Sequence, residues 1–77
     1  MRVEILTPDQ TLFEGEAEYV FLPGSDGALG VLNKHAAMIT TLRPGTLRVR
    51  TSEGEQSFEL VGGTVEVLDN KVLVLAA

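Results

Sequence analysis

The sequence predicts an all-β domain, a flattened β-sandwich or barrel with essentially no helix. Apolar residues recur with a period of two, and turn residues arrive about every ten positions. No window of helical length keeps an apolar stripe free of Gly and Pro. We expect residues 1–77 to form one domain with one core. Because hydrophobic residues make up 44% and aromatic residues 5%, Val, Leu and Ile are expected to fill that core.

The strands are expected in a regular order along the chain. Residues 2–5 alternate charged and apolar side chains before a turn at 8–10. In the second half, alternating segments flank turns at 52–55 and at 69–70. Turn residues between two alternating segments are typical of β-hairpins, so we expect two hairpins there.

The segment 23–45 carries the most specific Gly and Pro spacing of the chain. Residues 25–27 are expected to form a turn whose tip projects into solvent, followed by a short strand at 28–32. Asn33-Lys34 is expected to form a second turn, with His35 starting the next strand. We therefore look for function in these two polar loops, because loops on a rigid scaffold often carry binding residues.

Two segments depart from clean alternation. Within residues 15–22 the apolar parity changes, which predicts either a β-bulge near Glu18 or partial cover on both faces. The last strand, residues 71–76, is apolar on both faces. This pattern indicates either a further layer over its outer face or ordinary exposed aliphatic residues in a small protein.

Composition excludes several classes of function. The formal net charge is −5, which argues against nucleic acid or an anionic lipid surface as a partner. The chain has no cysteine, so disulfides and thiolate chemistry are excluded, and a reducing cytosol is expected. No apolar run approaches the ~20 residues that a bilayer span needs, and the first residues start a strand. We expect a soluble chain that is complete at its N-terminus, without direct lipid insertion.

No residue pattern indicates catalysis, a metal or a cofactor. His35 is the only histidine, and we expect it to have a packing or hydrogen-bonding role. Ser25 and Asp26 are adjacent in a turn without an oxyanion-hole motif, so turn chemistry explains them better than a triad with His35. The glutamates 14, 16 and 18 are expected on a solvated strand face. Glycines 24, 27 and 30 lack the following helix of a phosphate loop, so no nucleotide site is expected.

Several short motifs, taken together and in order, resemble one known family. They are E-I-L-T-P at 4–8, F-E-G at 13–15, G-S-D-G-A-L-G at 24–30, H-A at 35–36, L-R-P-G at 42–45, G-G at 62–63 and E-V-L-D-N-K-V-L-V-L-A at 66–76. The chain is thereby identified as similar to the N-terminal domain of the epsilon subunit of F-type ATP synthase. The resemblance covers essentially all 77 residues.

The resemblance implies a β-sandwich of two five-stranded sheets in the rotor of ATP synthase. It implies a non-catalytic central-stalk subunit between the gamma subunit and the polar loops of the c-ring, in only indirect contact with the alpha/beta assembly. It also implies a peripheral position on the cytoplasmic face of the bacterial plasma membrane. By carry-over, the c-ring contact is Ser25, Asp26, Gly27 and Ala28, and the gamma contact is His35, Ala36, Ala37 and Met38.

This sequence departs from the family pattern at several positions. Family members commonly have a carboxylate where Ala28 stands, Pro-Gly where Asn33-Lys34 stands, and proline where Ala37 stands. Charge pairing with the c-ring is then expected to rest on Asp26 or to be absent. Most bacterial members continue into a C-terminal helical hairpin, so if 77 residues is the natural length, neither helix-based inhibition nor nucleotide binding is expected.

Two other readings are open from the sequence. A biotinyl or lipoyl carrier domain is a β-sandwich of similar size, and Lys34 is its only plausible modified residue, although Asn33-Lys34-His35 does not match the usual carrier surroundings. A carbohydrate- or peptide-binding sandwich would need exposed aromatic platforms. The chain has only one tyrosine and three phenylalanines, which makes that reading weak.

Overall fold

The computed structural model describes all 77 residues, and its regular elements are strands without any helix. The prediction of an all-β sandwich is confirmed. The strands are β1 (Arg2–Leu6), β2 (Thr11–Glu16), β3 (Tyr19–Gly24), β4 (Gly27–Leu32), β5 (Met38–Leu42), β6 (Gly45–Thr51), β7 (Gly54–Leu60), β8 (Gly63–Leu68) and β9 (Lys71–Ala76).

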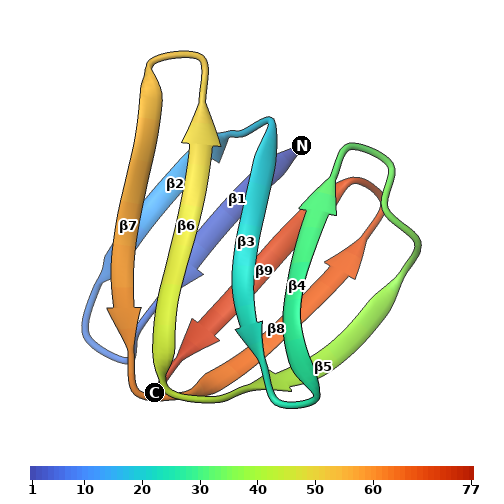
Figure 1. Cartoon of the computed structure of the whole chain (residues 1–77). Coiled ribbons are helices and arrows are strands. Elements are labelled where there is room, and N and C mark those ends of the chain that lie inside the picture. The colour runs from blue at the N-terminus through green and yellow to red at the C-terminus, as the bar shows by residue number, and fades with distance from the viewer.

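Hydrogen bonding joins the nine strands in the order β2-β1-β9-β8-β5-β3-β6-β7, with β4 paired to β3. Figure 1 shows this sheet folded into two layers, with β4, β3, β6 and β7 in front of β2, β1, β9, β8 and β5. The layers thus have four and five strands, where two five-stranded sheets were expected. The single pair Gly24↔Leu42 joins β3 to β5, so the layers are continuous at that side.

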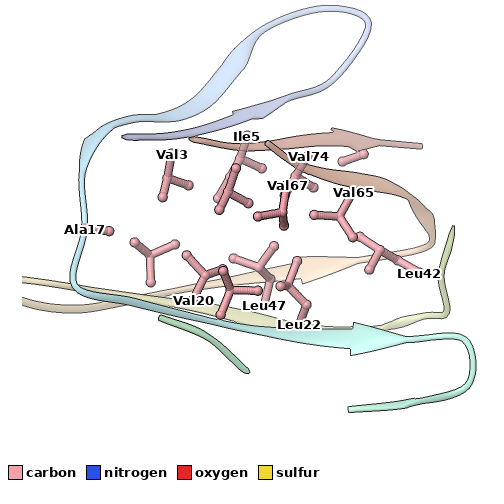
Figure 2. Close-up of a cluster of buried hydrophobic side chains, with 14 of the residues drawn as sticks. Val3, Ile5, Ala17, Val20, Leu22, Leu42, Leu47, Val65, Val67 and Val74 are labelled. Carbon is pink, nitrogen blue, oxygen red and sulfur yellow. The ribbon is translucent and has the colours of Figure 1, made fainter. Parts of the chain in front are cut away.

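The core lies between the two layers and is built from the inward residues of each strand (Figure 2). Sixteen hydrophobic residues are buried, and no polar or charged residue is. None of the sixteen is aromatic, which confirms that aliphatic side chains fill the core. Phe13 and Phe58 pack at its margin instead, with their ring centroids 6.3 Å apart.

Both predicted hairpins are present. β6 pairs with β7 around Ser52 and Glu53, and β8 pairs with β9 around Asp69 and Asn70. Asp69 and Asn70 have φ values of 51° and 60°. Two consecutive positive φ values are typical of the type I′ turn, whose twist matches that of the flanking strands.

The parity change in residues 15–22 marks a crossing between layers, so the predicted bulge near Glu18 is wrong. The Ala17 N–H donates to the Met1 carbonyl oxygen at 2.8 Å, whereas the Glu18 N–H donates to the Arg50 oxygen at 2.8 Å. Successive amides therefore bond to different layers, and the side-chain alternation restarts in β3. The register shift of this sheet lies instead between Ile5 and Leu6.

Partial cover on both faces of β3, the other expectation for this segment, is confirmed. Val20 and Leu22 are fully buried in the core, while Tyr19 and Phe21 on the opposite face are half-buried. The guanidinium carbon of Arg48 lies 4.5 Å from the centre of the Phe21 ring. A cation over an aromatic face is a favourable contact, so this outer face is covered by the chain itself.

Candidate interaction site

The two loops singled out from the sequence lie at opposite ends of β4, as Figure 1 shows. The 25–28 loop comprises Ser25, Asp26, Gly27 and Ala28, and the 33–38 loop runs from Asn33 to Met38. Since β4 runs from one loop to the other, they cannot form one compact site. Ser25 and Asp26 are accordingly held away from His35, which excludes a triad among these three residues.

The 25–28 loop is a tight connection between β3 and β4. Gly24 pairs with Gly27, and only Ser25 and Asp26 lie between them. The Ser25 N–H donates to the Thr41 carbonyl oxygen at 3.0 Å, and the two hydroxyl oxygens lie 2.6 Å apart. Gly27 has φ 132°, a conformation that residues with a Cβ rarely adopt.

The tip of the 25–28 loop faces solvent, as predicted. Ser25, Asp26 and Ala28 are exposed. The Asp26 carboxylate makes no hydrogen bond or ion pair within the chain, so it is free to meet a polar or cationic group outside it. The loop therefore offers a small, tightly turned tip with a single charge.

The 33–38 loop is irregular and is held by hydrogen bonds from distant residues. Asn33 Oδ1 accepts from the N-terminal ammonium at 2.6 Å, and the Lys34 N–H donates to Asn70 Oδ1 at 2.7 Å. The His35 N–H donates to the Leu32 oxygen at 3.2 Å, and His35 Nδ1 lies 2.7 Å from the Ala36 oxygen. Lys34 has φ 65°, in the left-handed region.

The prediction that His35 starts a strand is wrong, because β5 begins at Met38. The backbone before it turns back on β4 through the bond between His35 and Leu32. Ala36 and Ala37 are exposed, and His35 and Met38 are partly buried, so the four residues of the expected gamma contact lie together at the surface.

Lys34 does not occupy the place of a carrier lysine. Such a lysine is presented between two paired strands, but β4 pairs with β3 and β5 pairs with β8. Lys34 therefore lies in a connection between the two layers of the sandwich. Nothing in the structure supports the carrier alternative.

A third surface, which the loop motifs did not predict, covers the outer side of β1, β9, β8 and β5. Inward residues such as Val65, Val67 and Val74 are buried, so the residues between them face outward. The apolar outer face is defined here by Leu6, Ile39, Leu68, Leu73 and Leu75 around Glu66. Ile39 is 74% exposed, Leu68 51% and Leu75 49%, so no part of this chain covers the surface.

The signal for this face was present in the sequence, in the last strand with its apolar residues at both parities. Val72, Val74 and Ala76 enter the core, while Leu73 and Leu75 lie on the outer face. The contribution from β5 was not apparent, because only the sheet order β9-β8-β5 brings Ile39 beside Glu66 of β8.

The structure contains no group of three or more His, Asp or Glu side chains placed to hold a metal ion. It contains no helix with the length and apolar character needed to cross a membrane.

The whole chain, residues 1–77, matches a protein family described as "ATP synthase, Delta/Epsilon chain, beta-sandwich domain". Among curated proteins, it is 45% identical over 78 residues to the ATP synthase epsilon chain of Janthinobacterium sp. (strain Marseille), with 99% of this chain and 56% of that protein covered. It is 42% identical over 77 residues to the epsilon chain of Nostoc sp. (strain PCC 7120 / SAG 25.82 / UTEX 2576), with 97% and 56% covered. The chain spans about half the length of the curated relatives it matches.

Two solved structures have the same fold at low sequence identity. One is a chain in the central stalk and c-ring of the Tetrahymena thermophila mitochondrial ATP synthase, with a TM-score of 0.84, 23% identity, and 97% of this chain and 61% of that chain covered. The other is a chain in the OSCP, F1 and c-ring part of the Euglena gracilis mitochondrial ATP synthase, with a TM-score of 0.88, 23% identity, and 96% and 48% covered. Both likenesses extend over nearly the whole sandwich.

Proposed function

This chain belongs to the family of ATP synthase delta and epsilon chains, as their β-sandwich domain, and on that premise we propose that it is a non-catalytic subunit of the central stalk. It joins the gamma subunit to the c-ring, so that proton or sodium flow through the ring is coupled to ATP synthesis. It meets the alpha/beta assembly only indirectly. The observation that carries the proposal is the family match over all 77 residues.

The contact with the c-ring is assigned to Ser25, Asp26, Gly27 and Ala28. Their loop is exposed and is braced against β5 through Ser25 and Thr41, which suits a contact that has to transmit torque. Both solved structures of the same fold belong to ATP synthase assemblies that include the c-ring. Because Ala28 carries no charge, Asp26 supplies the only carboxylate of this contact.

The contact with the gamma subunit is assigned to His35, Ala36, Ala37 and Met38, and it extends onto the apolar outer face. A groove of about 340 Å³ beside this loop is lined by Ala37, Met38, Ile39, Glu66, Val67 and Leu68. A large exposed aliphatic surface is typical of a protein interface. The 25–28 and 33–38 loops lie at opposite ends of β4, an arrangement that suits a subunit bridging two partners.

The proposed location is peripheral, on the cytoplasmic face of the bacterial plasma membrane, with attachment through the c-ring and gamma rather than through lipid. The net charge of −5 supports attachment through protein, because an anionic lipid surface would repel the chain.

Cysteine cross-linking in assembled membranes tests this function, and the absence of native cysteine makes single-site labelling clean. Ala28→Cys is expected to trap the c subunit, and His35→Cys to trap gamma. Ser52→Cys, in the exposed β6–β7 turn, is the matched control and is expected to trap neither. If both products were absent while the assembly was intact, the proposal would be wrong.

A further inference from the structure

Glu66 lies at the centre of the apolar outer face, where strand pairing surrounds it with aliphatic side chains. Its partners on the neighbouring strands are Ile39 of β5 and Leu73 of β9. Along β8 its neighbours on the same face are Thr64 and Leu68. Directly opposed residues in a sheet have Cβ atoms about 5 Å apart, so the aliphatic side chains of Ile39 and Leu73 flank the carboxylate on both sides.

Two grooves meet at this residue. The groove next to the 33–38 loop has a volume of about 340 Å³, and Glu66 and Leu68 form part of its lining. A second groove of about 330 Å³ is lined by Glu66, Leu68, Asp69, Lys71 and Leu73. Glu66 and Leu68 therefore line both hollows.

The Glu66 carboxylate has no cation within the chain, in contrast to its acidic neighbours on the same sheet. Glu4 lies 3.6 Å from Lys71 Nζ, and Glu14 lies 3.0 Å from Arg2. Glu66 makes no ion pair and no side-chain hydrogen bond. Lys71, the cation diagonal to it, is already engaged by Glu4.

A partner that covers this face removes water from a carboxylate that has no hydrogen bond or ion pair within the chain. Burying an unpaired charge is strongly unfavourable, whereas a basic group placed opposite it restores the lost solvation and fixes the register of the two surfaces. We propose that the gamma subunit brings a lysine or arginine side chain opposite Glu66, set among aliphatic side chains that enter the two grooves. This inference rests on the gamma contact proposed above.

The direction in which Glu66 variants change the affinity for gamma shows whether gamma supplies a cation opposite this carboxylate. Glu66→Gln removes the charge at nearly constant shape, and Glu66→Leu also adds apolar surface. If gamma supplies a cation, both variants leave it unpaired and weaken binding, by about tenfold or more. If gamma supplies none, both variants remove a desolvation cost and bind equally well or more tightly.

The experiment measures the affinity of the chain for its purified cognate gamma subunit at two salt concentrations. Glu53→Gln, which removes one carboxylate from the exposed β6–β7 turn, is the matched control and is expected to bind like the wild type. Glu66→Asp keeps the charge on a shorter side chain and is expected to lose less than Glu66→Gln. Thermal unfolding checks that each variant is folded. Wild-type binding is expected to weaken with salt more steeply than binding of Glu66→Gln.

Failure of this inference is separable from failure of the proposed function. Binding of the wild type, with unchanged or tighter binding of Glu66→Gln and Glu66→Leu, would overturn the inference and leave the gamma contact standing. If the wild type itself did not bind, the gamma contact would be wrong, and the inference would be overturned with it.

Discussion

The two loops at the ends of β4 are held in place by different means. The 25–28 loop is set by backbone geometry, with glycine before and after a two-residue turn and one brace to Thr41. The 33–38 loop has a local backbone bond from His35 to Leu32, but side chains tie it to distant parts of the chain, since Asn33 and Asn70 bond to groups far away in the sequence. Backbone geometry gives a loop that resists displacement, whereas side-chain bonds can be lost one at a time. The loop proposed to meet the c-ring is therefore expected to be the stiffer of the two.

The largest expected effect comes from Gly24→Ala, at the base of the 25–28 loop. An added Cβ would lie 2.5 Å from the Gly27 carbonyl oxygen and 2.8 Å from Leu29 Cδ2. The first of these is a backbone atom, so the turn itself has to move. We expect the free energy of unfolding to fall by about 2–3 kcal/mol, measured by denaturant titration.

Gly15→Ala is the matched control for this change, because it adds the same methyl group to another strand glycine. There the nearest atoms are in the Phe13 ring, at 3.7 Å, which is ordinary contact. We expect a loss well below that of Gly24→Ala. Equal losses in the two variants would show that the 25–28 loop is not set by the close approach at Gly24.

The next largest effect is expected from Asn70→Gly, which acts on the 33–38 loop from the β8–β9 turn. Glycine accepts the φ of 60° at this position but cannot accept the bond from the Lys34 N–H. The loss is expected to be about 1 kcal/mol, with faster hydrogen exchange at the Lys34 amide. Asn70→Asp keeps an acceptor oxygen and is expected to retain slow exchange; fast exchange in both would mean that this bond does not hold the loop.

The difference between the loops also explains what the sequence could predict. The hairpins and the exposed 25–28 loop follow from neighbouring residues, and all are confirmed. The strand start at His35 was wrong, because the backbone there is held by Asn70, which lies 36 residues from Lys34. For the parity change near Glu18, partial cover on both faces is confirmed and the alternative of a bulge is wrong, because alternation within one strand cannot show that the chain is changing layers. Glu66 was missed, since its aliphatic surroundings come from three strands.

Lys34→Gly is expected to stabilise the protein. It would show that the 33–38 loop, unlike the 25–28 loop with Gly27, has a side-chain-bearing residue at a positive φ. Lys34 has φ 65°, and its side chain makes no hydrogen bond or ion pair. A left-handed conformation costs a residue with a Cβ roughly 1–2 kcal/mol, part of which is offset by the greater freedom of glycine in the unfolded chain. We expect a gain of about 0.5–1 kcal/mol in the free energy of unfolding.

Lys34→Ala separates this backbone effect from the loss of a lysine side chain. Alanine keeps the strain, so its free energy of unfolding is expected to stay within about 0.5 kcal/mol of the wild type. If alanine and glycine raised the free energy of unfolding equally, the gain would come from loss of the lysine charge, and the backbone explanation would be wrong.

The smallest effect is expected from Ser25→Ala, which removes the hydroxyl brace between the 25–28 loop and β5. The two hydroxyl oxygens are 2.6 Å apart and exposed, while the backbone bond from the Ser25 N–H to the Thr41 oxygen stays in place. We expect a loss of about 0.5 kcal/mol, at the low end for a hydrogen bond because water competes for both groups.

Ser52→Ala tests whether that loss belongs to the brace or to serine in a turn. Ser52 has the equivalent position in the β6–β7 turn, before an acidic residue and a glycine of φ 124°, but its hydroxyl makes no hydrogen bond. Ser52→Ala is therefore expected to leave the free energy of unfolding almost unchanged. In a protein that already carries Thr41→Val, Ser25→Ala is likewise expected to cause little further loss. If Ser25→Ala lowered the free energy of unfolding equally in the Thr41→Val background, the Ser25 hydroxyl would not stabilise the loop through Thr41 of β5. The stiffness of the 25–28 loop would then rest on Gly24 and Gly27 alone.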